Sequence, residues 1–110
     1  MSHRELEGEL HSLANLIRDH VMYPQEYETK RGIFQQQLLI IIFQFTQVRL
    51  DPRIPLEIEV LLADPTLHGL KKILTQAHRD IIAALKLHPE NQKLKKEEIR
   101  WLELIQKIKA

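Results

Sequence analysis

The stretch QQQLLIIIFQF, residues 35–45, decides the fold, because six consecutive apolar residues are compatible with a membrane span, a buried strand or a core helix. It lies within residues 32–48, an uncharged run of 17 residues that includes five glutamines. A membrane-spanning helix needs about 20 predominantly apolar residues. The run is too short and too polar for that, so we expect no membrane span.

The choice between strand and helix depends on the period of the apolar residues. Alternating apolar and polar residues predict a β-hairpin within residues 38–62 and an α+β fold. A spacing of three and four residues, typical of a helix, connects Tyr27, Phe34, Leu38, Ile41, Phe45 and Val48. Glutamine also favours helix more than strand. We predict a helix and keep the hairpin as the alternative.

The same helical spacing recurs in three further segments, residues 6–21, 67–84 and 94–108. Prolines separate the segments, because proline lacks an amide hydrogen and disfavours helical geometry in the residue before it. A fifth, short helix is expected over residues 55–63. In the last helix we expect the buried face to carry Leu94, Trp101, Ile105 and Ile108, with Ile99 and Leu102 beside them. The prediction is an all-α, single-domain bundle of about five helices, four long and one short, over residues 1–110.

Composition limits the classes of protein. The chain has no cysteine, which excludes disulfides and thiolate chemistry and is typical of a reducing compartment. Charged residues near the N-terminus, including Arg4, Glu5 and Glu7, occupy the place where a secretory signal needs an apolar run. We therefore expect a cytoplasmic protein.

No constellation of residues predicts catalysis. No two of the six histidines lie three or four residues apart, the separation that places two imidazoles on one helical face for a shared metal. The three glycines are isolated, so no phosphate-binding glycine loop is present. We expect neither an enzyme nor a bound metal or cofactor.

Charge is unevenly distributed along the chain. Residues 1–66 hold six basic and ten acidic side chains, whereas residues 67–110 hold ten basic and five acidic ones. A nucleic-acid-binding surface on the last two helices is therefore one hypothesis. Its candidate residues are Lys71, Lys72, Arg79, Lys93, Lys96 and Arg100. Because Glu97, Glu98 and Glu103 interrupt the basic residues, an ordinary solvated helix is the simpler interpretation.

The helix over residues 34–48 gives a more specific indication of binding. At 100° per residue, one side of it is opposite the predicted core stripe. That side carries Gln36, Leu39, Ile40, Phe43 and Gln47. Two interpretations are open. Other helices of the domain enclose this side, or it forms a protein interface with an apolar centre and a polar margin. The function we predict is an adaptor, regulatory protein or small subunit that acts by protein–protein contact, including self-association.

Overall fold

The computed structural model describes residues 1–109, and these residues form five helices and no strand. The helices are α1 (His3–Val21), α2 (Pro24–Thr46), α3 (Val60–Ala63), α4 (Leu67–Leu87) and α5 (Gln92–Lys109). The predicted all-α fold with four long helices and one short helix is confirmed. The alternative hairpin at residues 38–62 does not form, because α2 continues as a helix to Thr46.

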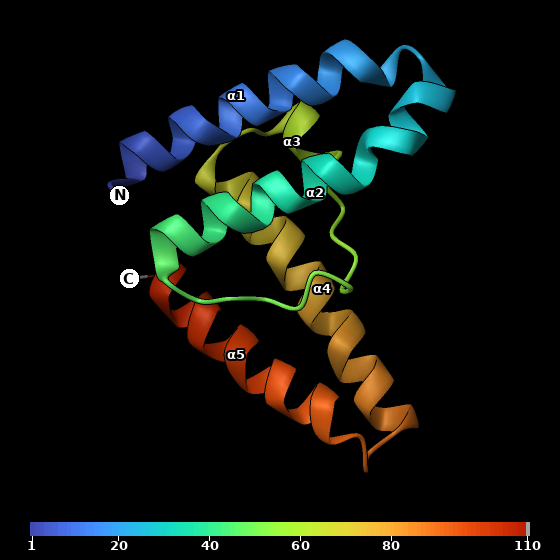
Figure 1. Ribbon diagram of the computed structural model, residues 1–110. Coiled ribbons are helices and arrows are strands. Elements are labelled where there is room, and N and C mark those ends of the chain that lie inside the picture. The colour runs from blue at the N-terminus through green and yellow to red at the C-terminus, as the bar shows by residue number, and fades with distance from the viewer. Residues whose placement is uncertain (110) are drawn as a thin grey trace.

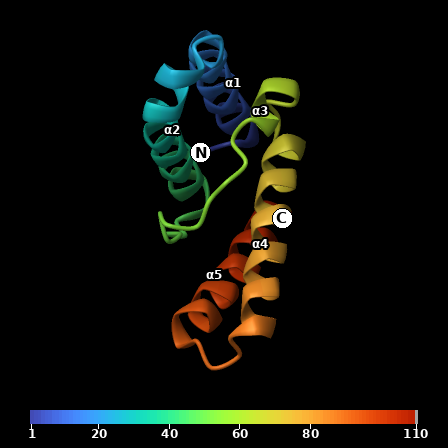
Figure 2. The same cartoon turned by 90° about the vertical axis from the view of Figure 1, so that its right-hand side faces the viewer.

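The long helices form two antiparallel pairs, α1 with α2 and α4 with α5 (Figures 1 and 2). Residues 47–66, which include α3, connect the pairs, and α3 contacts both α1 and α4. The molecule measures 42 × 34 × 19 Å. Its short dimension equals roughly two helix diameters, since a helix with its side chains is about 10 Å across. The bundle is therefore thin, and a helix in it keeps one face at the surface.

Buried apolar side chains from all five helices and from residues 48–58 form the core. On α1 and α2 they are Leu6, Leu10, Leu13, Ala14, Ile17, Phe34, Leu38, Ile41 and Ile42. In the connection and the last three helices they are Val48, Leu56, Ile58, Leu61, Leu70, Ile73, Leu74, Ala77, Ile81, Trp101, Leu104 and Ile108. None of the helices in this described part of the chain is long and apolar enough to cross a membrane.

Local sequence explains where three of the helices begin. The Ser2 hydroxyl accepts a hydrogen bond from the backbone N–H of Glu5 at 3.2 Å, as the spacing of these two residues indicates. Thr66 caps α4 in the same way, and the Asn91 side chain accepts from the N–H of Leu94 at 3.2 Å. These side chains satisfy amide groups that have no carbonyl partner within their own helix.

The predicted start of the short helix is wrong by about one turn. α3 begins at Val60, not near Pro55, because side chains of α2 bind the backbone that precedes it. Gln35 accepts from the N–H of Leu56 at 3.1 Å, and Arg31 donates to the carbonyl of Leu56 at 2.8 Å. The Leu56 carbonyl also accepts from the N–H of Ile58 at 2.9 Å, which is a turn and not a helical hydrogen bond, so α2 holds this segment in a non-helical conformation.

The predicted buried face of α5 is also partly wrong. Trp101 and Ile108 are buried as expected, but Ile99 and Leu102 are 65% and 44% exposed. Glu97 and Leu104 complete the buried face instead. The physical reason is that α5 packs against α2 and its following loop as well as against α4. Lys107 donates to the carbonyl of Thr46 at 3.0 Å on that side.

Candidate protein-binding surface

Apolar side chains of α2 lie on two opposite sides of the helix. The inner side packs into the core through Phe34, Leu38, Ile41 and Ile42. The opposite side, which we call the outer face of α2, is the surface of the molecule. It consists of Ile33, Gln36, Gln37, Ile40, Phe43, Gln44 and Gln47. Ile33 is 54% exposed and Ile40 is 56% exposed, so the chain's other helices leave this face uncovered.

Four of the five predicted protein-binding residues line one surface depression. We call it the Phe43 depression, and it is lined by Gln36, Leu39, Ile40, Phe43, Arg49, Leu50 and Pro52. The fifth predicted residue, Gln47, is exposed at the end of α2 and is not part of the lining. The depression therefore combines the predicted helix face with a loop segment that the helical period does not identify.

A second depression runs along the groove between α1 and α2. Its lining residues are Glu9, Ser12, Leu13, Leu16, Gln37, Ile40, Ile41 and Gln44. Ile40 belongs to both depressions, so they are adjoining parts of one surface. Leu16 of α1 is 44% exposed and adds apolar area beside Ile40. Exposed apolar side chains gathered in this way form a candidate binding surface.

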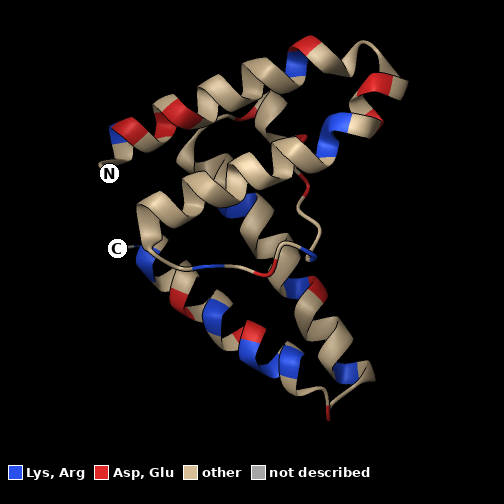
Figure 3. Cartoon of the chain, in the orientation of Figure 1, with Lys and Arg blue, Asp and Glu red and all other residues tan. Residues whose placement is uncertain are grey.

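The outer face of α2 carries no charge. Residues 32–48 contain no lysine, arginine, aspartate or glutamate, and the second half of α2 is uniformly tan in Figure 3. The nearest cation in the chain after this run is Arg49, whose guanidinium lies 4.8 Å from the centre of the Phe43 ring. A guanidinium at this distance is attracted to the face of the ring. Arg49 thereby covers part of Phe43 and leaves Ile40 as the more exposed apolar residue.

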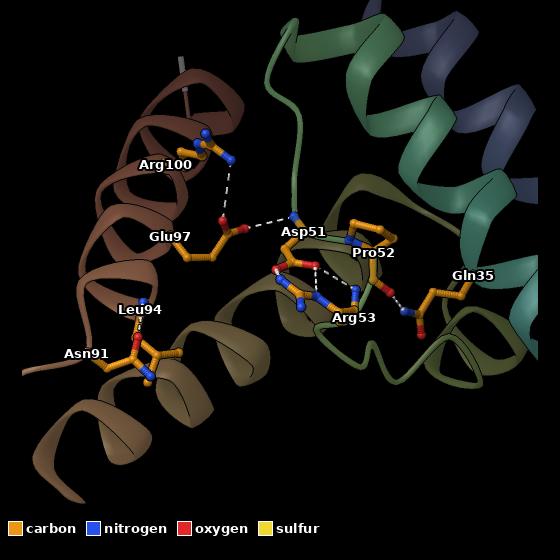
Figure 4. Close-up of polar contacts among 8 residues, drawn as sticks. All are labelled: Gln35, Asp51, Pro52, Arg53, Asn91, Leu94, Glu97 and Arg100. Carbon is orange, nitrogen blue, oxygen red and sulfur yellow. Dashed lines mark hydrogen bonds and ion pairs between the residues drawn. The ribbon is translucent and has the colours of Figure 1, made fainter. Parts of the chain in front are cut away.

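The loop at the edge of the Phe43 depression is fixed from two helices (Figure 4). Gln35 of α2 donates to the carbonyls of Pro52 at 3.3 Å and Ile54 at 3.0 Å. Glu97 of α5 accepts from the backbone N–H of Asp51 at 2.9 Å. Arg53 closes the turn by donating to the Asp51 carboxylate. These bonds hold Pro52 and its neighbours in place, so one wall of the depression is built before any partner binds.

A polar network fixes the first half of α2 to the segment before α3. Glu59 accepts from the Tyr27 hydroxyl at 2.5 Å and from Arg31 Nε at 2.6 Å. Burial and the hydrogen bond to Glu59 raise the pKa of Tyr27 to about 12. Burial of Glu59 acts to raise its pKa, but hydrogen bonds from Arg31 and Tyr27 outweigh burial and place the pKa below its usual value. The network therefore holds Glu59 as a carboxylate and orients α2.

The six candidate nucleic-acid-binding residues lie in two groups. Lys71, Lys72 and Arg79 of α4 line one depression together with His68, Thr75 and Gln76. On α5, Arg100 forms an ion pair of 3.6 Å with Glu97, and Lys96 is exposed. Lys93 lies near Asp51, whose pKa is lowered first by hydrogen bonds from Arg53 and also by the charge of Lys93. The structure thus brings three of the six into one depression.

Three of the six histidines, His20, His68 and His78, each lie beside one acidic side chain. His78 Nε2 lies 3.2 Å from Glu98, and His68 Nδ1 lies 3.0 Å from Asp64. No group of three or more potential metal ligands converges within residues 1–109. The outer face of α2 combines two strongly exposed isoleucines with a wall that hydrogen bonds hold in place.

Comparison with known proteins found no relative of this chain. No family model matches the sequence, and no curated protein and no solved structure matches the chain.

Proposed function

We propose that the chain is a cytoplasmic adaptor, regulatory protein or small subunit that acts by protein–protein contact and not by catalysis. The contact surface is the outer face of α2 with the adjoining Phe43 depression. The observation that carries this proposal is Ile40, which is 56% exposed at the point where two surface depressions meet. An apolar centre with a glutamine margin has the composition of a protein interface.

The occupant we propose is a second copy of the chain. A two-fold contact places the same surface on both sides, so charges on it would meet like charges near the axis. The outer face of α2 avoids this cost because it is uncharged from residue 32 to residue 48, and Arg49 is the one charged residue in the lining of the adjoining Phe43 depression. Glutamine amides both donate and accept hydrogen bonds, so a glutamine margin is complementary to itself.

Co-purification of two differently tagged copies tests the proposal. We expect the copy with the second tag to be retained on a resin for the first tag when both are wild type and to be lost when both carry Ile40→Glu. Ile99→Glu is the matched control, because Ile99 is an isoleucine of α5 that is 65% exposed and lies outside the two depressions. Retention of the Ile40→Glu copy at the wild-type level would contradict the proposal.

Nucleic-acid binding is the alternative function, supported by the depression that Lys71, Lys72 and Arg79 share. Fluorescence anisotropy with a labelled duplex and a labelled single strand tests it. Binding through phosphates weakens steeply as salt rises, because bound counterions are released. We expect no sub-micromolar binding at physiological salt; such binding, lost on charge reversal of Lys71 and Lys72, would favour the alternative.

A further inference from the structure

We infer that α4 and the last turns of α5 form a second docking surface, which binds an acidic peptide segment that carries one aliphatic side chain. The surface consists of two adjoining depressions. They share no residue with the outer face of α2 or with the two depressions beside it. The inference goes beyond the proposed function, because it gives the chain a separate surface for a second partner.

The first of the two, which we call the basic depression, has no acidic side chain in its lining. It is lined by His68, Lys71, Lys72, Thr75, Gln76 and Arg79, which lie on one face of α4. Asp64, near one end, pairs with His68 at 3.0 Å and with Lys72 at 3.9 Å. Lys71 and Arg79 form no ion pair with any residue from 1 to 109. Both cations are therefore available to an acidic partner.

The second, which we call the α4–α5 cleft, combines apolar and basic side chains. The two helices lie side by side (Figure 2), and the cleft between them is lined by the buried Leu74 and Ile108 and the half-buried Ile105. Lys71 of α4 and Lys109 of α5 also line it. Its volume is about 160 Å³, whereas sites for small-molecule ligands hold roughly 300 Å³ or more. The cleft therefore suits a single aliphatic side chain between two lysines.

The two depressions form one continuous surface, because Lys71 and Thr75 line both. Lys71 and Arg79 are eight residues apart on α4, which corresponds to about 12 Å along the helix. About four residues of an extended peptide span this distance. A short segment with its aliphatic side chain in the α4–α5 cleft can therefore place acidic side chains at both cations.

The cleft favours an acidic peptide over a nucleic acid as the partner. Phosphates would also pair with Lys71 and Arg79, but neither depression contains a phenylalanine, tyrosine or tryptophan on which a base could stack. An aliphatic cleft beside cations instead matches a protein interface with an apolar anchor and a polar rim. The acidic start of α1 in a second copy is not such a segment, because its Leu6 and Leu10 are completely buried.

Fluorescence anisotropy of the full chain at physiological salt tests the inference. The probe is a short fluorescein-labelled peptide of aspartate and glutamate with one central leucine. We expect saturable binding that weakens at least about fivefold when alanine replaces this leucine, because the aliphatic contact is lost. The double variant Lys71→Glu, Arg79→Glu should bind the leucine peptide at least about tenfold more weakly than wild type.

The matched control is the double variant Lys86→Glu, Lys95→Glu. It changes the net charge by the same amount, at two exposed lysines outside both depressions. It should bind within about twofold of wild type, because salt screens distant charges. Equal losses for the two double variants would overturn the inference, since general attraction between opposite charges would then explain the binding. Circular dichroism of each variant checks that the helices are retained.

Three further results would each overturn the inference. The first is no saturable binding of the leucine peptide, and the second is equally tight binding of the alanine peptide. The third is a labelled duplex that binds more tightly than the leucine peptide and is lost in the Lys71→Glu, Arg79→Glu variant, which would identify a nucleic-acid surface. Ile40→Glu should bind the peptide as wild type does, so this test is independent of the contact through α2.

Discussion

Glu97 Oε1 accepts a 2.9 Å hydrogen bond from the backbone N–H of Asp51, which ties α5 to the loop beside the Phe43 depression. Glu97 is only 6% exposed and stands on the buried face of α5. Replacing it with alanine leaves the Asp51 amide without this partner. We expect Glu97→Ala to lower the free energy of unfolding by about 1–3 kcal/mol, measured by urea unfolding. Glu103→Ala is the control, because Glu103 is exposed on the same helix; equal losses for the two variants would contradict the role of Glu97.

Gly69 allows a close approach that no other residue permits. A Cβ atom at this position would lie 1.8 Å from the carbonyl oxygen of Asp64, which is a backbone atom and cannot swing away. We expect Gly69→Ala to destabilise the protein by about 1–3 kcal/mol, as overpacking does. Gly8→Ala is the matched control, since a Cβ there meets none of the described residues within 4 Å and alanine stabilises a helix interior by up to about 1 kcal/mol. Urea unfolding of both variants should therefore give opposite signs, and a neutral Gly69→Ala would contradict the packing.

Glu59 makes stability depend on pH on the acid side. Its pKa in the folded chain lies below the usual value, despite burial, because Arg31 and Tyr27 donate hydrogen bonds to it. The stabilisation is complete above the unfolded pKa, near 4.5, and is lost as the pH falls through the lower folded pKa. We expect Glu59→Gln to be less stable than wild type at pH 7 and the difference to shrink at pH 3, measured by urea unfolding at both values. Glu57→Gln, at an exposed position, should show little difference at either pH, and a Glu59→Gln deficit that stays constant with pH would rule out this linkage.

Trp101 is completely buried, and its indole N–H has no hydrogen-bond partner within residues 1–109. We expect blue-shifted tryptophan emission from the folded protein. Trp101→Ala should cost about 3–5 kcal/mol by urea unfolding, as large cavity-forming substitutions in a core do. Trp101→Phe should cost less, because phenylalanine supplies a smaller aromatic ring that fills much of the same space, and the substitution removes a buried donor. Emission like that of free tryptophan would contradict the burial of Trp101 in the core.

The periodic helices were predictable from the sequence, and tertiary contacts explain what was missed. Apolar residues three and four apart predict α1, α2 and α4, because one buried stripe suffices to place a helix on a core. The start of α3 was missed since Gln35 and Arg31 of α2 bind the backbone of Leu56. Such a contact between distant residues has no local signal.

The buried face of α5 was also missed because tertiary contacts determine it. Apolar residues occupy a wide arc of this helix, and Ile99 and Leu102 fit the pattern as well as Leu104 does. The neighbours of α5 decide which of them is buried. In the candidate site, the helical period identified Leu39, Ile40 and Phe43, but Leu16 belongs to another helix and Leu50 to a loop. Only the fold brings these two beside Ile40 and Phe43.

Sedimentation equilibrium of wild type and Ile40→Glu tests the central claim most directly. Ile40 is better suited to this test than Phe43, because Arg49 partly covers Phe43. A glutamate in place of the exposed Ile40 is solvated in a free copy. We predict a wild-type mass of twice 13.0 kDa. Ile40→Glu should be a monomer with unchanged helicity, because loss of a central interface residue costs at least about 2 kcal/mol, or roughly 30-fold in Kd. A wild type that sediments as a monomer at all concentrations, or an Ile40→Glu variant that remains a dimer, would contradict the account.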